Sequence, residues 1–120
     1  MDNLIERMNT DAMLRLHGAY YSTQISIVSD DEINCFDISQ GEVSRLDSKV
    51  PAGGFSLVAS PDVWSRYCMD IPPPEYHELG AMLSMGHLKI EGDMKVMQSN
   101  MMYVRCFLEL WREDQLDTNQ

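Results

Sequence analysis

The most reactive side chains in this sequence, three histidines and three cysteines, are widely separated. His17, His77 and His87 form no HxxxH or HExxH pattern, which is the spacing that puts two ligands on one helix face. Glu75 and Glu78 flank His77, but neighbouring residues on a helix point in different directions. We therefore expect no metal site and no histidine-based catalysis.

The cysteines Cys35, Cys68 and Cys106 are odd in number, far apart and without a CxxC motif. This usage predicts reduced thiols in a cytoplasmic protein and not a disulfide framework. Cys68 and Cys106 are conceivable nucleophiles, but both have apolar neighbours and no adjacent histidine. The sequence favours buried, inert thiols.

Charged and glycine-rich segments also lack the patterns of known cofactor sites. The acidic run at 30–32 does not have the EF-hand spacing, and Gly53-Gly54 is too short to cradle a phosphate. We therefore expect no cofactor and no enzyme. The formal net charge of −10, from 19 acids and 9 bases, argues against nucleic acid and against anionic lipid surfaces. The acids are dispersed, so they either solubilise the surface or attract a basic partner.

The length of 120 residues predicts one domain over 1–120, with an N-terminal helix or helices at 1–17 and a flexible tail at 113–120. Asp2, Glu6 and Arg7 make the N-terminus unlike a signal peptide. No apolar run has the length of a membrane span, so we expect no stable membrane insertion.

The first half of the chain changes from helical to strand periodicity. Ile5, Met8, Ala12 and Leu16 recur at helical spacing, and the residues at 9–11 leave open whether they belong to one helix or two. Alternation over 20–29 predicts a strand, 33–38 predicts the returning strand of an antiparallel hairpin, and a short strand is possible at 43–46.

The second half begins with a strand at 55–59, followed by a helix that Ser60 caps and Pro61 opens. The prolines at 72–74 indicate a stiff connector. A helix from about Glu75 to Gly86, a brief strand at 87–91 and a last helix from Asp93 to about Arg112 complete the expected elements.

Two segments resemble the sterol carrier protein type 2 family. The segment Gly86–Met97, GHLKIEGDMKVM, is similar to that family's G-x-L-K-I-x-G-[ND] motif, and Ser56–Trp64 resembles its strand-then-helix segment. The resemblance covers roughly residues 10–112. It implies an α+β, two-layer fold, in which about five strands form a mixed, mainly antiparallel sheet with helices on one face. It also implies a tunnel between helices and sheet for a fatty acyl chain, an acyl-CoA or a sterol.

The methionine content, ten in 120 residues, suits either an adaptable lipid lining or ordinary core packing. Under the resemblance, the expected apolar lining is Leu79, Leu83, Met85, Met97, Met101, Val104 and Leu108. Phe36, Ile25 and Leu57 are candidates for the sheet floor, and Trp64 and Trp111 for either the core edge or a pocket rim.

We therefore predict a noncatalytic domain that binds or transfers a lipid. The alternative is a noncatalytic interaction or dimerisation module, or an enzyme subunit, with a filled pocket and the first helix as the contact surface. The chain ends in Asp117-Thr118-Asn119-Gln120, which is not the peroxisomal Ser-Lys-Leu type, so we expect a cytoplasmic and bacterial setting.

Overall fold

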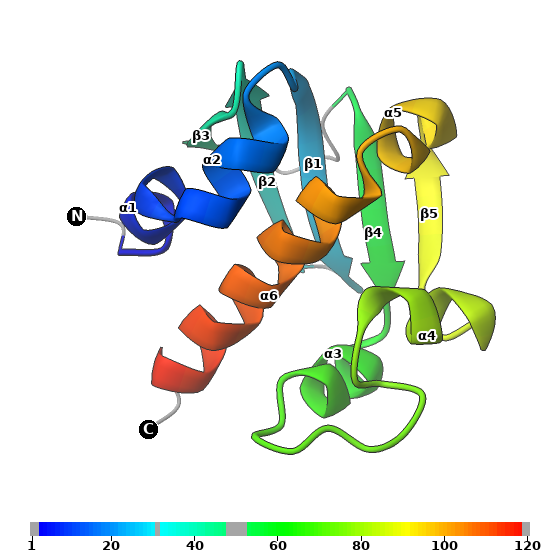
Figure 1. Cartoon of the computed structure of the whole chain (residues 1–120). Coiled ribbons are helices and arrows are strands. Elements are labelled where there is room, and N and C mark those ends of the chain that lie inside the picture. Colours follow the sequence, from blue (N-terminus) through cyan, green and yellow to red (C-terminus); the bar gives the residue numbers. More distant parts are fainter. Residues whose placement is uncertain (1–2, 31, 48–52, 119–120) are drawn as a thin grey trace.

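The centre of the fold is a five-stranded sheet (Figure 1), seen in a computed structural model that describes residues 3–30, 32–47 and 53–118. The strands stand in the order β3-β2-β1-β4-β5. Their bounds are Thr23–Ser29 (β1), Glu32–Ser39 (β2), Glu42–Leu46 (β3), Phe55–Ala59 (β4) and Lys89–Gly92 (β5). All five lie within two residues of the segments expected from the sequence, except that β1 begins three residues late.

Strand pairing confirms the predicted sheet type. β1 pairs with β2, β2 with β3, and β4 with β5 in antiparallel fashion, whereas β1 and β4 run parallel. The sheet is therefore mixed and mainly antiparallel, as the resemblance implied.

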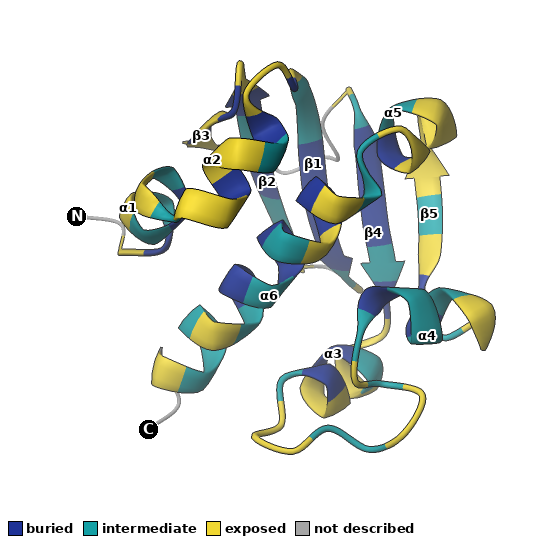
Figure 2. Cartoon of the chain, in the orientation of Figure 1, coloured by how far each residue is buried: buried dark blue, intermediate teal, exposed yellow. Residues whose placement is uncertain are grey.

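Six helices accompany the sheet in the described part of the chain, and in Figure 1 the longest of them, α6, runs diagonally across it. Their bounds are Asn3–Thr10 (α1), Ala12–Gly18 (α2), Pro61–Tyr67 (α3), Leu79–Ser84 (α4), Met94–Gln98 (α5) and Met101–Thr118 (α6). Figure 2 places the buried residues on the strands and on the inner sides of the helices. The predicted α+β class is confirmed.

The core lies between α6 and the middle of the sheet. Ile25 and Phe36 are cross-strand partners, and both are completely buried. The ring of Phe107 meets Phe36 edge-on, with centroids 5.1 Å apart, and stacks against Tyr103 at 6.2 Å. These aromatic rings fill the space that the alternating apolar residues of β1 and β2 leave open to the helices.

The N-terminal segment forms two helices, which settles the alternative left open by the sequence. Asp11 separates them, because its carboxylate accepts from the Leu14 amide at 2.9 Å and caps α2. Asn9 bonds both the amide and the carbonyl of Val43 on edge strand β3, at 2.7 and 2.8 Å. An edge strand presents unpaired backbone groups, and this side chain satisfies two of them.

The break divides the apolar stripe that was expected to serve dimerisation. Met8 is completely buried and Ile5 packs against the core, whereas Leu16 on α2 is 69% exposed. The four residues of that stripe therefore do not form one continuous surface.

The start of α3 is as predicted, with Ser60 as N-cap and Pro61 in the first turn. The predicted start of the next helix at Glu75 is wrong. Glu75 has a φ of 76°, outside the helical region, and α4 begins only at Leu79. Glu78 is its N-cap, accepting from the Ala81 amide at 2.6 Å.

The motif around Gly92 ends β5 and opens α5. Gly92 has a φ of 101°, and a Cβ there would lie 2.5 Å from the Gly54 carbonyl oxygen, so the turn requires glycine. Asp93 then caps α5 through the Val96 amide at 3.2 Å.

The prediction of one last helix from Asp93 to Arg112 is right about its start, which Asp93 caps, but wrong about its continuity and its end. The helix is interrupted at residues 99–100, where Asn100 accepts from the Val104 amide and starts α6 in a new direction. The expected tail is helical as far as Thr118, and Arg7 of α1 forms a 2.7 Å ion pair with Asp117. Asp31 and residues 119–120, which belong to the expected acidic turn and tail, lie outside the described residues.

Candidate functional site

The seven residues predicted to line a ligand site differ in burial. Four are buried in the core: Leu79, Met97, Val104 and Leu108. The other three are half-buried, as Leu83 and Met101 are, or exposed, as Met85 is. The sheet-floor candidates Ile25, Phe36 and Leu57 are completely buried. None of the seven lines any of four well-formed pockets in the described residues, so their role as a lining stays a prediction.

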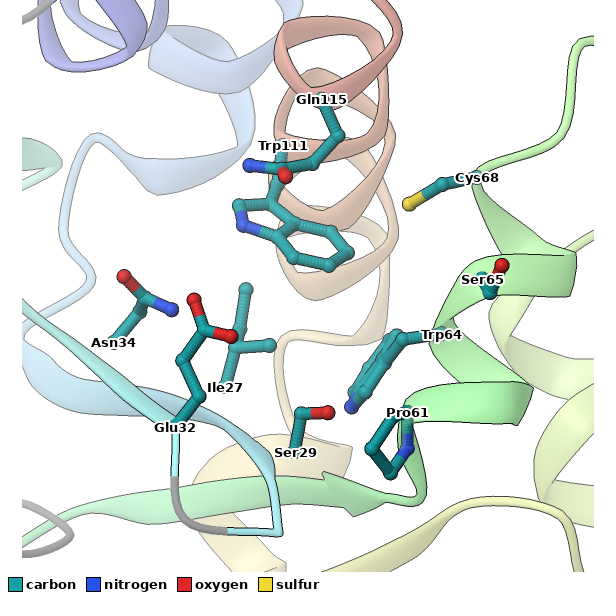
Figure 3. A pocket seen from close by; sticks show the side chains of 10 residues that line it. All are labelled: Ile27, Ser29, Glu32, Asn34, Pro61, Trp64, Ser65, Cys68, Trp111 and Gln115. Carbon is teal, nitrogen blue, oxygen red and sulfur yellow. The ribbon is translucent and has the colours of Figure 1, made fainter. Parts of the chain in front are cut away.

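A pocket of about 330 Å³ opens elsewhere between the helices and the sheet (Figure 3). It lies where α3 and the C-terminal half of α6 face the β1–β2 hairpin. Its lining residues, which define the Trp pocket, are Ile27, Ser29, Glu32, Asn34, Pro61, Trp64, Ser65, Cys68, Trp111 and Gln115.

The floor of the Trp pocket is the polar end of the helix-facing side of the hairpin. Ile27 pairs with Asn34, and Ser29 pairs with Glu32. On the helix-facing side of the hairpin, these are the next two pairs after the buried Ile25–Phe36 pair. Side chains two residues apart share a face of the strand. The helix-facing row of β2 therefore changes from Phe36 to polar residues, over which a dry contact with α6 would cost free energy.

Two tryptophans form the walls of the Trp pocket. Trp64 of α3 and Trp111 of α6 meet edge-on, with centroids 5.2 Å apart and an interplanar angle of 72°. The indole nitrogen of Trp64 donates to the Val28 carbonyl at 2.8 Å, which fixes α3 on the sheet. The sequence left open whether these residues belong to the core edge or to a pocket rim, and the structure has them in both roles.

Arg112 holds the two helical walls together. Its Nε donates to the Tyr67 carbonyl at 2.8 Å and its Nη2 to the Asp70 carbonyl at 3.1 Å. The same guanidinium lies 5.9 Å from the centroid of the Tyr67 ring. The carbonyl of Tyr67, the last residue of α3, is thereby satisfied, and the separation of α3 from α6 is fixed.

The residues that line the Trp pocket are suited to binding a ligand. Burial raises the pKa of the Cys68 thiol to about 11, so it is protonated at neutral pH, although the nearby Arg112 lowers it somewhat. No histidine stands among the ten lining residues. What they offer a ligand is aromatic surface, hydroxyl and amide groups, and one carboxylate.

Sequence reasoning missed Ile27, Asn34 and Glu32 as site residues. A signal was present, because in a strand that begins at Glu32 the polar Glu32 and Asn34 share a face with the apolar Phe36 and Ile38. Polar residues continuing an apolar strand face mark a place where that face is not closed by packing.

Elsewhere, the three cysteines all lie in the described part of the chain and are thiols. Among the described residues, no group of three or more histidine, cysteine or acidic side chains is arranged to hold a metal ion. No helix of the described chain combines the length and apolar character needed to cross a membrane.

The fold and the pocket together define a class: a two-layer α+β domain with an opening between its helices and its sheet. The fold is that of sterol carrier protein 2, whose crystal structure matches with a TM-score of 0.72 over 92% of this chain and 91% of that chain, at 12% identity. A ubiquinone synthesis protein, UbiJ-SCP2, matches with a TM-score of 0.53 over 80% of this chain and 81% of that chain, at 14% identity.

The sequence carries less of this likeness than the structure does. No protein-family model and no curated protein sequence matches the chain. The structural matches confirm that the resemblance seen at Gly86–Met97 extends to the whole fold. At 12–14% identity they concern the fold and not the ligand.

Proposed function

We propose that this chain is a noncatalytic domain that binds a small apolar or amphipathic ligand in the Trp pocket and carries it. One observation carries the proposal: a pocket of about 330 Å³ separates the helices from the sheet in a fold shared with a sterol carrier protein. Small-molecule sites typically measure roughly 300–1,000 Å³. The Trp pocket is at the lower limit, which favours a slender ligand.

Burial of apolar surface is the proposed source of affinity. Each Å² of apolar ligand surface removed from water contributes about 25 cal/mol, which offsets the loss of ligand freedom. Trp64 and Trp111 line the pocket with aromatic surface that an alkyl or ring-shaped body can contact, and Ile27 lies between them at the bottom. A protonated Cys68 adds apolar surface and no nucleophile.

The predicted lining enters this proposal as an extension of the Trp pocket. Leu108 lies one turn before Trp111 on α6, and Val104 lies one turn further in. We infer that the tail of a longer ligand would displace Leu108 first and then reach Val104 and Met101. Cytoplasmic action, which the reduced cysteines favour, is part of the same proposal.

The two tryptophans of the pocket are the only ones in the chain, so intrinsic fluorescence reports directly on it. Delipidated protein titrated with decanol should give a saturable change in tryptophan emission. Ser65→Phe, which fills the pocket from an exposed position on α3, should weaken binding by about tenfold or more, because the added ring competes for the apolar space.

The matched control is Ser84→Phe, which makes the same change at an exposed position on α4, outside the Trp pocket. Its decanol binding should equal that of the unaltered protein. The proposal is refuted by a lack of saturable emission change with decanol, or by equal effects of the two variants.

A further inference from the structure

The Trp pocket carries its charge at one position. Of the ten described residues that line it, Glu32 alone is an acid, and none is lysine, arginine or histidine. The only other titratable group among them, the Cys68 thiol, stays neutral because burial raises its pKa to about 11. A ligand in the pocket therefore meets a negative charge with no positive charge among the lining residues that the structure describes.

The strand side of the pocket carries the polar side chains of Ser29, Glu32 and Asn34. Figure 3 shows the Glu32 carboxylate and the Asn34 amide next to each other on the β2 side, with Trp64, Pro61 and Cys68 on the opposite side. Gln115 adds a second amide above Trp111. An amphipathic ligand gains most by placing its tail along the rings and its polar end toward β2.

Two arginines on neighbouring elements are engaged outside the lining. Arg112 follows Trp111 on α6, but its guanidinium bonds the carbonyls at the end of α3. Arg45 of β3 donates to the Asn34 side-chain oxygen at 3.3 Å and lies over the Phe36 ring, 4.9 Å from its centroid, without lining the pocket. The formal net charge of −10 adds a negative background.

We propose that the Trp pocket selects amphipathic ligands with a cationic or neutral hydrogen-bonding end, and that Glu32 excludes those ending in a carboxylate. This inference rests on the proposed function and specifies its ligand class. A carboxylate would stand against Glu32 without a partner in the lining, whereas an ammonium group would pair with it.

Three probes with one tail isolate the end group: decylamine, decanol and decanoate. At pH 7.5 the amine is protonated and the acid ionised, since their pKa values are about 10 and about 4. In titrations followed by tryptophan emission, the binding affinity should fall in the order amine, alcohol, acid. The amine should bind about tenfold more tightly than the acid, as expected of a partly solvated unit-charge contact. Raising the salt concentration should reduce the difference in affinity between the amine and the acid, because salt screens the charge of Glu32.

Glu32→Gln should reduce the amine-over-acid preference to about twofold, and Glu32→Lys should reverse it. Glu91→Gln on β5 removes the same charge from an exposed position outside the Trp pocket, and should keep the tenfold preference. If decanoate binds as tightly as decylamine, or if Glu91→Gln acts like Glu32→Gln, this inference is wrong and the proposed function remains. If none of the three probes binds, the proposed function fails as well.

Discussion

The helices of this protein meet the sheet differently at the two ends of α6. At the packed end, near Tyr103 and Phe107, the interface is filled with rings and excludes solvent. At the Trp pocket, near Trp111, the same helix leaves about 330 Å³ open. The difference lies in the sheet below, which is apolar under the packed end and turns polar at Asn34 and Glu32. A fold shared with carriers can therefore be closed at one end and open at the other.

The largest effect on stability should come from a substitution that creates space at the packed end of α6. Leu108 is completely buried one turn before Trp111, and Leu108→Ala should lower the free energy of unfolding by about 2–5 kcal/mol. The same change should enlarge the Trp pocket inward, so that alkyl alcohols longer than decanol bind more tightly than they do to the unaltered protein. Denaturant unfolding and a chain-length series by tryptophan emission measure the two effects.

An unchanged chain-length preference in a folded Leu108→Ala protein would contradict the inferred path into the packed end. Leu110→Ala is a suitable control, because Leu110 is also buried on α6 but directly precedes Trp111, so its side chain lies on a different side of the helix. It should cost stability without altering the preference for chain length.

Alkaline pH should destabilise both ends of α6, at different pH values. Burial raises the pKa of Cys68 at the Trp pocket from 9 to about 11, and that of Tyr21 at the packed end from 10 to about 12. A raised folded-state pKa means stability that is fully present below the unfolded value and is lost as pH rises through the folded value. Stability should therefore fall from pH 9 upward, and more steeply above pH 10.

Denaturant unfolding measured between pH 8 and 12 checks both parts of this decline. Cys68→Ser should reduce the part that begins near pH 9, to which Cys106 also contributes, because burial raises the pKa of that thiol too. Tyr21→Phe should reduce the part above pH 10, to which Tyr67 and Tyr103 also contribute, because burial raises their pKa values as well. A free energy of unfolding that is constant up to pH 11 would contradict the assignment.

A smaller effect concerns two tyrosines of the packed end, whose rings meet edge-on at 5.0 Å. The Tyr103 hydroxyl is buried without a hydrogen-bond partner among the described residues, whereas the Tyr21 hydroxyl donates to the Val96 carbonyl at 2.9 Å. Tyr103→Phe should raise the free energy of unfolding at pH 7 by about 1 kcal/mol, since it removes an unsatisfied group. Tyr21→Phe should lower it by about 1 kcal/mol. Equal changes of the same sign in the free energy of unfolding would show that the two hydroxyl groups do not differ in hydrogen bonding as described.

Local chemistry explains what the sequence made predictable. The strand alternation of β1, the Ser60-Pro61 helix start and the Gly92-Asp93 turn are all encoded within a few residues, and they were predicted correctly. The helix break at residues 99–100 and the late start of α4, which Glu78 caps, were missed because the apolar spacing continues across both points.

The candidate site depends on such long-range placement. Trp64 and Trp111 are far apart in sequence, and only the orientation of α6 over the hairpin brings their rings together. The methionine spacing drew attention to the other end of the helix. There Val104 is buried in the core, while Met102 remains 49% exposed, so spacing alone did not indicate where space remains.

The location of the bound ligand tests the account most directly. Decanol titrated into isotopically labelled protein should shift the two indole NH resonances of Trp64 and Trp111 and the amide resonances of Ile27 and Asn34, while those of Met97 and Val104 stay in place. Shifts centred on Met97, Met101 and Val104, with both indole signals unmoved, would contradict the assignment of the ligand site to the Trp pocket.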